Sequence, residues 1–261
     1  MVERLVPDEL WELFQLVVPA APSRPQGGGR RRYGDHEVLA AIVFVATSGC
    51  TWAQLPPCFS PSGPTAHRRI TEWSRARVWA KPHRVVLDEL GARGALDWSR
   101  CAVDSVNMRA LKGELTGPNP VDRGKNGSKI HLLTGRIGLP LSLAISEANA
   151  HDSQALIPLV EAIPPIRSRR EPRWRKPGKL HGDKAYGHRF IRSYLRRCQI
   201  PARIARRGVQ SSQRLGRYRW VIERAVAPLG GFHRLHCRYE RKADHFAAFA
   251  AALIYLRRIP K

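Results

Sequence analysis

Three carboxylates in this chain have the surroundings expected of metal ligands. Acidic residues are scarce, with 21 Asp and Glu among 261 residues, so a carboxylate flanked by apolar sequence is conspicuous. Asp104 lies within Cys-Ala-Val-Asp-Ser, Asp183 within Leu-His-Gly-Asp-Lys-Ala-Tyr, and Glu223 within Trp-Val-Ile-Glu-Arg. A few such carboxylates, together with water and phosphate oxygens, can hold two Mg²⁺ ions about 4 Å apart. The set therefore predicts metal-assisted cutting of DNA, with Mg²⁺ as the cofactor and Mn²⁺ able to substitute.

The elements around these carboxylates are predicted to form a mixed α/β fold. Three strands come first, followed by helix, strand, helix, strand and helix. The predicted elements are strands Arg100 to Val106, Gly127 to Thr134 and Leu139 to Ser146, helix His151 to Ile163, strand Lys179 to Gly182, helix Gly187 to Cys198, strand Ala202 to Ala205, a long helix from about Leu215, and a last helix Ala243 to Arg258. The order β-β-β-α-β-α-β-α is that of an RNase-H-like fold.

This fold would bring the three carboxylates together. Its first and fourth strands are neighbours, which places Asp104 and Asp183 at the same end of the sheet. The helix after the fifth strand can lay Glu223 beside them. Taken singly, each carboxylate would more often be a helix cap or an ion-pair partner, and Glu223 could pair with Arg219 one helical turn away. Their order and placement on separate elements favour the metal site.

The first third of the chain is predicted to be a small all-α domain. Asp35 caps an apolar helix through Ser48, Thr51 caps a very short helix, and a further helix runs to about Trp79. This order is typical of a helix-turn-helix, whose second helix enters the major groove by its N-terminal residues. The first turn of that helix carries the expected DNA contacts, His67, Arg68 and Arg69. A helical bundle with a solvated basic face is the alternative.

We therefore expect two domains. A helical DNA-binding domain, helix-turn-helix-like, would cover residues 1–95 and include a basic linker at 20–32. An RNase-H-like catalytic domain would cover residues 96–261.

The charge of the chain indicates a polyanionic partner. The formal net charge is +24, and residues 166–207 alone hold 15 basic residues against two acidic ones. Such an excess points to nucleic acid. The chain has no apolar stretch of the roughly 20 residues that a membrane span needs. It also lacks a secretory signal, which predicts a cytoplasmic protein, associated with the nucleoid when bound to DNA.

Other function classes find little support in the sequence. Five dispersed cysteines without a Cys-x-x-Cys pair argue against a disulfide framework and a zinc site. No P-loop, dinucleotide-binding fingerprint or Ser-His-Asp order suggests a small-molecule substrate.

The sequence resembles the DDE-class transposases of bacterial insertion sequences, specifically the insertion-sequence-five family, which is related to the insertion-sequence-four group. Several segments in order carry the resemblance. They are Gly49-Cys-Thr-Trp-Ala-Gln-Leu-Pro56 with Trp73, Leu96 to Ser105, Lys112-Gly113, Gly117 to His131, Ala148 to Asp152, Gly182 to Tyr186, Arg219 to Arg224 and Arg238-Tyr-Glu240.

The resemblance implies a role for each carboxylate. Asp104 would be the first metal ligand, Asp183 the second and Glu223 the third, with Arg219 as the basic residue one turn before the glutamate. It also implies an enzyme that binds the terminal inverted repeats of its element and catalyses strand cleavage and strand transfer into target DNA. Cutting two ends together implies a homodimer or larger assembly on double-stranded DNA. We expect Lys129, Lys184 and Arg219 to contact DNA as well.

Three positions depart from the family pattern. Gly216 replaces a tyrosine of the glutamate signature, Gly230 replaces a lysine that follows it, and Pro228 should kink or end the helix five residues after Glu223. Two alternatives therefore stay open. One is a metal-dependent nuclease that cuts without joining, and the other is a decayed copy that binds terminal DNA without catalysis.

Overall fold

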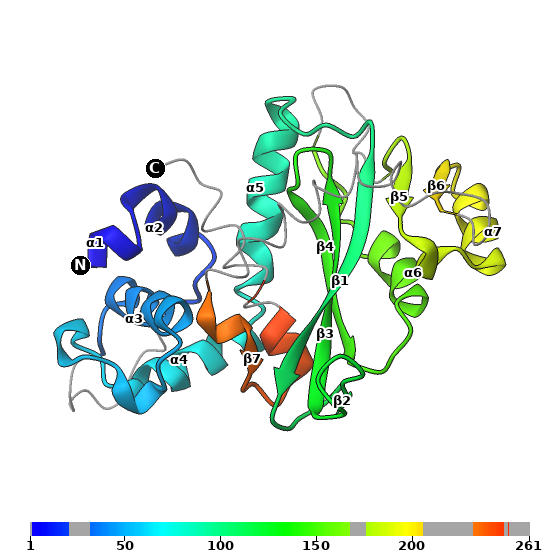
Figure 1. Cartoon of the computed structure of the whole chain (residues 1–261). Coiled ribbons are helices and arrows are strands. Elements are labelled where there is room, and N and C mark those ends of the chain that lie inside the picture. The colour runs from blue at the N-terminus through cyan, green and yellow to red at the C-terminus, as the bar shows by residue number, and fades with distance from the viewer. Residues whose placement is uncertain (1, 21–31, 168–175, 206–231, 248–249, 251–261) are drawn as a thin grey trace.

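The computed structural model describes residues 2–20, 32–167, 176–205, 232–247 and 250. A helical N-terminal part lies beside a mixed sheet that carries helices on its other face (Figure 1). The helical part comprises α1 (Val2–Leu5), α2 (Asp8–Gln15), α3 (Asp35–Ser48), η1 (Trp52–Gln54), η2 (Pro57–Phe59), α4 (Gly63–Arg75) and α5 (Ala80–Ala92).

The predicted order of helix, short helix and basic helix is confirmed in α3, η1 and α4. The α3 helix is apolar along most of its length and buries Val38 to Val43, Val45 and Ala46, and its C-cap is Gly49, which has a φ of 74°. Thr51 and Gln54 form a reciprocal capping box on η1. The predicted cap at Asp35 is wrong: Gly34 is the N-cap, and Asp35 lies in the first turn. There its carboxylate faces the guanidinium of Arg69.

The second part of the chain forms the sheet and its helices. These elements are β1 (Cys101–Ala110), β2 (Gly117–Pro118), β3 (Asn126–Gly135), β4 (Pro140–Glu147), α6 (Ser153–Glu161), β5 (Leu180–Gly182), η3 (Lys184–Tyr186), α7 (Arg189–Arg197), β6 (Ala202–Ile204), η4 (His233–Leu235) and β7 (Cys237–Arg238). The strands of the central sheet lie in the order β4-β3-β1-β5-β6. The first three are antiparallel, and β1, β5 and β6 run parallel.

This topology confirms the predicted RNase-H-like order as far as β6. The long helix expected from about Leu215 lies outside the described residues, as does most of the last predicted helix. Two short strands were not predicted: β2 pairs with β3, and β7 pairs with the far end of β1.

The described residues form two hydrophobic cores, which lie on opposite faces of the sheet. The first joins the N-terminal helices to the sheet through Met108, Ile130 and Leu132. The second joins the sheet to α6 and α7 through Val103 and Leu133. Neighbouring strand residues contribute to different cores because successive side chains point to opposite faces.

The boundary predicted between residues 95 and 96 stays a prediction. Side chains from both sides of it pack into each core, since the first core includes N-terminal helices together with sheet residues and Leu87 of α5 belongs to the second. Among the described helices, none is long and apolar enough to cross a membrane.

Candidate active site

Asp104 and Asp183 lie level with each other on neighbouring strands. In the parallel pair of β1 and β5, Cys101 is opposite Leu180 and Ala102 is opposite His181. The same register, continued by two residues, sets Asp104 opposite Asp183, just past the end of β5. The expectation that these two strands are adjacent is therefore confirmed, and both aspartates lie where the paired strands begin to diverge.

One edge of β1 pairs with β5 near its start and with β7 near its end. Asp104 lies in the stretch of β1 between these two pairings. The N–H of Cys101 donates to the carbonyl of Lys179 beside β5, and the N–H of Arg109 donates to the carbonyl of His236 beside β7. Odd-numbered N–H groups of β1 thus point to this edge, because the direction alternates along a strand. The N–H of Ser105 points the same way, beyond the end of β5, and donates to Oδ1 of Asp104 at 2.8 Å.

Asp183 is held by a local turn. It follows β5 as the N-cap of η3, and its Oδ1 accepts a hydrogen bond from the N–H of Ala185 at 2.9 Å. The residue is exposed, so its carboxylate can meet a ligand from solvent. Each aspartate therefore has one oxygen oriented by a backbone N–H, which limits the rotation of its carboxylate.

A third carboxylate in the described structure, that of Asp152, lies close to this pair. Tyr186 is 1% exposed, and burial raises the pKa of its hydroxyl far above the ordinary value. The charges of Asp152, Asp104 and Asp183 raise that pKa further, in this order of size. The hydroxyl therefore stays protonated among three negative groups, and only two of them were predicted as site residues.

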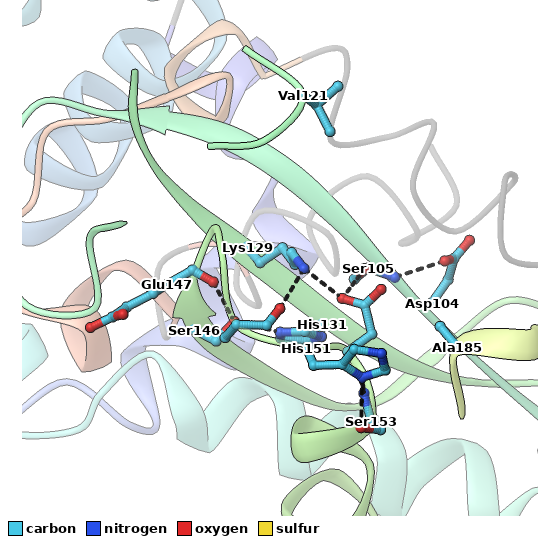
Figure 2. A network of polar contacts seen from close by, with 12 residues as sticks. Asp104, Ser105, Val121, Lys129, His131, Ser146, Glu147, His151, Ser153 and Ala185 are labelled. Atoms are coloured by element: carbon cyan, nitrogen blue, oxygen red, sulfur yellow. Dashed lines mark hydrogen bonds and ion pairs between the residues drawn. The ribbon is translucent and has the colours of Figure 1, made fainter. Parts of the chain in front are cut away.

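Asp152 is held by a lysine and a serine. Its Oδ1 accepts hydrogen bonds from Nζ of Lys129 at 2.8 Å and from Oγ of Ser105 at 3.0 Å (Figure 2). Nζ of Lys129 also donates to the carbonyl of Ala150 at 2.7 Å. Burial alone would raise the pKa of Asp152, but the hydrogen bonds and the positive charge of Lys129 outweigh it and hold that pKa below the usual value. Asp152 is therefore ionised at neutral pH.

The predicted DNA contacts separate into exposed and buried residues. His67, Arg68 and Lys184 are exposed. Arg69 is 4% exposed and pairs with acidic side chains inside the fold. Lys129 is 8% exposed and is engaged with Asp152.

The two residues predicted from the glutamate helix, Glu223 and Arg219, lie outside the described residues. The same holds for Gly216, Pro228 and Gly230. In the sequence, Glu223 falls between β6 and β7, and β7 is the strand that borders the edge of β1 beyond Asp104.

The donor set fits a hard divalent cation. Asp104 and Asp183 offer carboxylate oxygens, the ligands that Mg²⁺ and Mn²⁺ prefer, and no soft ligand was predicted beside them. Within the described ranges, no group of three or more His, Cys, Asp or Glu is arranged to hold a metal ion. Glu223, the third predicted ligand, lies outside these ranges.

Comparison with known proteins identifies the class to which this chain belongs. Residues 98–257 match the family described as "Transposase DDE domain", which covers more than half of the chain. The chain belongs to the DDE transposase family, and membership implies the use of a divalent metal ion. Residues 6–83 match a second family, "Putative transposase of IS4/5 family (DUF4096)".

Two relatives come from Burkholderia cepacia. The "Putative transposase for insertion sequence element IS402" is 43% identical over 134 residues, which are 51% of this chain and 64% of that protein. The "Insertion element IS402 uncharacterized 16.2 kDa protein" is 37% identical over 123 residues, which are 46% of this chain and 84% of that protein. This chain thus spans less than two thirds of the first relative.

Solved structures of the Mos1 transposase are much more distant. Its paired-end complex with the left transposon end has a TM-score of 0.28 at 14% identity, covering 87% of this chain and 83% of that one. Its pre-cleavage transpososome has a TM-score of 0.29 at 12% identity, covering 96% and 84%. Scores this low do not bear on the arrangement of the site.

Proposed function

We propose that this chain is a DNA transposase that binds the ends of its insertion sequence and catalyses metal-dependent strand cleavage and strand transfer. The observation that carries the proposal is the pairing of Asp104 and Asp183 at the divergence of two parallel strands, in a chain of the DDE family. Glu223 would complete the set of three ligands. Mg²⁺ is the proposed cofactor, and Mn²⁺ would replace it.

The residues of the chain have distinct parts in this reaction. Asp104 and Asp183, oriented by the N–H groups of Ser105 and Ala185, would hold the metal ions together with Glu223. When bound, the ions would activate the attacking oxygen and stabilise the leaving oxygen in an in-line displacement. The attacking group would be water in cleavage and the freed 3′-OH in strand transfer.

Exposed basic residues would contact the DNA. His67 and Arg68 in the first part of α4 would reach the major groove in the manner of a helix-turn-helix. Phosphate contacts would come from Lys184 and from the exposed arginines of α7, which are Arg189, Arg196 and Arg197. Because each neutralised phosphate releases counterions, binding should weaken steeply as salt rises. Arg219 would contribute near Glu223.

Burial removes two residues from this proposed surface. Arg69 and Lys129, both predicted to contact DNA, are paired with carboxylates inside the fold. We therefore assign them to the support of the structure and leave the DNA contacts to exposed neighbours.

The proposed assembly follows from the reaction. Two terminal inverted repeats cut together, and a target duplex, call for a homodimer or larger complex on double-stranded DNA. Residues 1–95 would bind the terminal repeats and residues 96–261 would carry the chemistry. The protein would act in the cytoplasm on the nucleoid.

The test uses the purified chain with a labelled duplex that carries the native end of the element, a target plasmid and Mg²⁺. Cut ends and joined products from the wild type, lost in Asp183→Asn and kept in Asp8→Asn, would support transposition; Asp8 is an exposed aspartate at the start of α2. Cut ends without joining would favour the nuclease. Binding of the duplex without any product would indicate the decayed copy.

A further inference from the structure

We propose that Asp152, clamped by Lys129, is a positioning residue that holds Ser105 and through it the metal-binding carboxylate of Asp104. The inference rests on the proposed metal site and adds a function for three residues that the site itself does not use as ligands. Its consequence is measurable without DNA, because a displaced Asp104 should bind a divalent ion more weakly.

The support comes from the face of the sheet opposite to Asp104. Side chains of β1 alternate, so Asp104 shares a face with Met108, which packs in the first core. Ser105 shares the other face with Val103, which packs in the second core with α6. Asp152 precedes α6 on this second side. The carboxylate of Asp152 therefore supports β1 from behind the strand.

Ser105 links the two carboxylates directly. Its Oγ donates to Oδ1 of Asp152 at 3.0 Å, while its own N–H donates to Oδ1 of Asp104 at 2.8 Å (Figure 2). Both donors belong to one residue, so a shift of Ser105 moves the N–H that orients Asp104. Among the described strands, β5 ends before this point and β7 begins after it. The side-chain bond to Asp152 thus holds β1 where no described strand pairs with that edge.

Lys129 fixes Asp152 in turn and balances its charge. Lys129 lies on β3, and its side chain is 10% exposed against 25% for that of Asp152. Nζ contacts both the carboxylate of Asp152 and the carbonyl of Ala150, which ties the start of α6 to β3. The lysine also places a positive charge beside a group of carboxylates that would otherwise repel one another. The ion pair therefore holds Asp152 ionised and in place to accept the hydrogen bond from Ser105.

The test compares two serines whose hydroxyls donate to different acceptors, the carboxylate of Asp152 and a main-chain carbonyl. Ser105→Ala removes the hydroxyl that donates to Asp152 and that also contacts the hydroxyl of Tyr186. Ser142→Ala is the matched control, because Oγ of Ser142 likewise donates one hydrogen bond across to the α6 side, to the carbonyl of Leu159 at 2.7 Å; Ser142 is buried, whereas Ser105 is half-buried. Binding of Mn²⁺ to the full-length protein is followed by the loss of the free-ion electron paramagnetic resonance signal. The Mn²⁺ concentration for half-maximal cleavage provides a second readout.

We expect Ser105→Ala and Asp152→Ala each to weaken Mn²⁺ binding by about tenfold, as is typical when a group that orients a ligand is lost. Ser142→Ala should bind like the wild type, and Ser105→Thr, which keeps the hydroxyl, should restore affinity. If Ser105→Ala binds Mn²⁺ as tightly as Ser142→Ala while Asp104→Asn does not bind it, the positioning role is overturned and the metal site stands. Wild-type binding that does not depend on Asp104 would overturn the metal site and the inference with it.

Discussion

Arg68 and Arg69 are adjacent in the sequence, but the structure exposes the side chain of one and buries that of the other. Both were predicted to contact DNA from the first turns of α4. Arg68 has a side chain that is 74% exposed, whereas that of Arg69 is 5% exposed and faces Asp35 and Glu72. Replacing each arginine by methionine, in separate proteins, should therefore damage different properties of the molecule.

The loss of stability in Arg69→Met follows from its ion pairs. Its Nη1 lies 3.0 Å from Oδ1 of Asp35, and its Nε lies 3.6 Å from Oε2 of Glu72. Removing one partner of a buried pair costs about 3–5 kcal/mol. Here the acidic side chains are 22% and 44% exposed, and the 3.0 Å contact lacks the alignment of a hydrogen bond. Water therefore screens part of the effect, and we expect a loss of about 2 kcal/mol.

Arg68→Met should leave folding intact and weaken DNA binding. Its nearest acidic contact, to Glu72, is 3.9 Å long and exposed, so the free energy of unfolding should change by less than about 0.5 kcal/mol. If Arg68 contacts a phosphate, the slope of log affinity against log salt should fall by about one. For Arg69→Met the slope should equal that of the wild type.

Two assays on each protein decide the outcome. Urea unfolding, followed by tryptophan fluorescence, gives the free energy of unfolding. Fluorescence anisotropy with a terminal-repeat duplex at several salt concentrations gives the slope. The reasoning fails if Arg69→Met unfolds like the wild type while its salt slope falls, because Arg69 would then be acting at the DNA surface.

Two further predictions concern the interior. His131 is fully buried and bonded to Ser146, and burial lowers its pKa to about 4, so the unfolded chain takes up a proton first as pH falls from about 6.5. His131 should contribute about 3 kcal/mol to the stability that the protein loses between pH 6.5 and 4, so His131→Gln should lose correspondingly less, as measured by urea unfolding; parallel pH curves would contradict this. Arg238 is fully buried and donates to the carbonyls of Glu114, Glu240 and Arg241 and to Oγ of Ser128. Lysine cannot match this fork, so Arg238→Lys should lose about 3 kcal/mol in the same assay, while the exposed Arg197→Lys should not change; equal stabilities would refute the assignment.

The placement of the two aspartates could be predicted because it depends on strand order. Each follows or interrupts a short apolar run, and the pattern of three strands followed by alternating helices and strands makes the first and fourth strands neighbours. The edge on which they meet was not predicted. It depends on where β5 ends and on β7, a two-residue strand too short to leave a pattern in the sequence.

The burial of Arg69 was missed although the sequence held a signal for it. Ala66, Ile70 and Trp73 mark the buried face of α4, and Arg69 lies three residues after the first and four before the last. It is therefore on the same face. A long side chain at such a position can reach an acidic partner, here Asp35, from another helix.

The pairing of Lys129 with Asp152 could not have been found from the sequence alone. The residues lie on β3 and just before α6, and their contact depends on how the helix packs on the sheet. Lys129 lies between two buried residues of a strand that is covered on both faces, so its side chain is less expected to reach DNA at the surface. Nothing in the neighbouring sequence identifies its partner.

The α5 helix was not predicted for a different reason. Pro82 suggests the end of a helix, but it lies in the first turn of α5, where proline is tolerated.

The most direct test of the proposed activity is excision and integration in cells, with the native flanking DNA on a donor plasmid. The wild type, Asp104→Asn, Asp183→Asn and the control Asp8→Asn would be compared at equal protein levels. We expect joined products from the wild type and from Asp8→Asn, and none from the two site variants. Joined products from Asp104→Asn or Asp183→Asn at the wild-type frequency would contradict the assignment of these aspartates to the metal site.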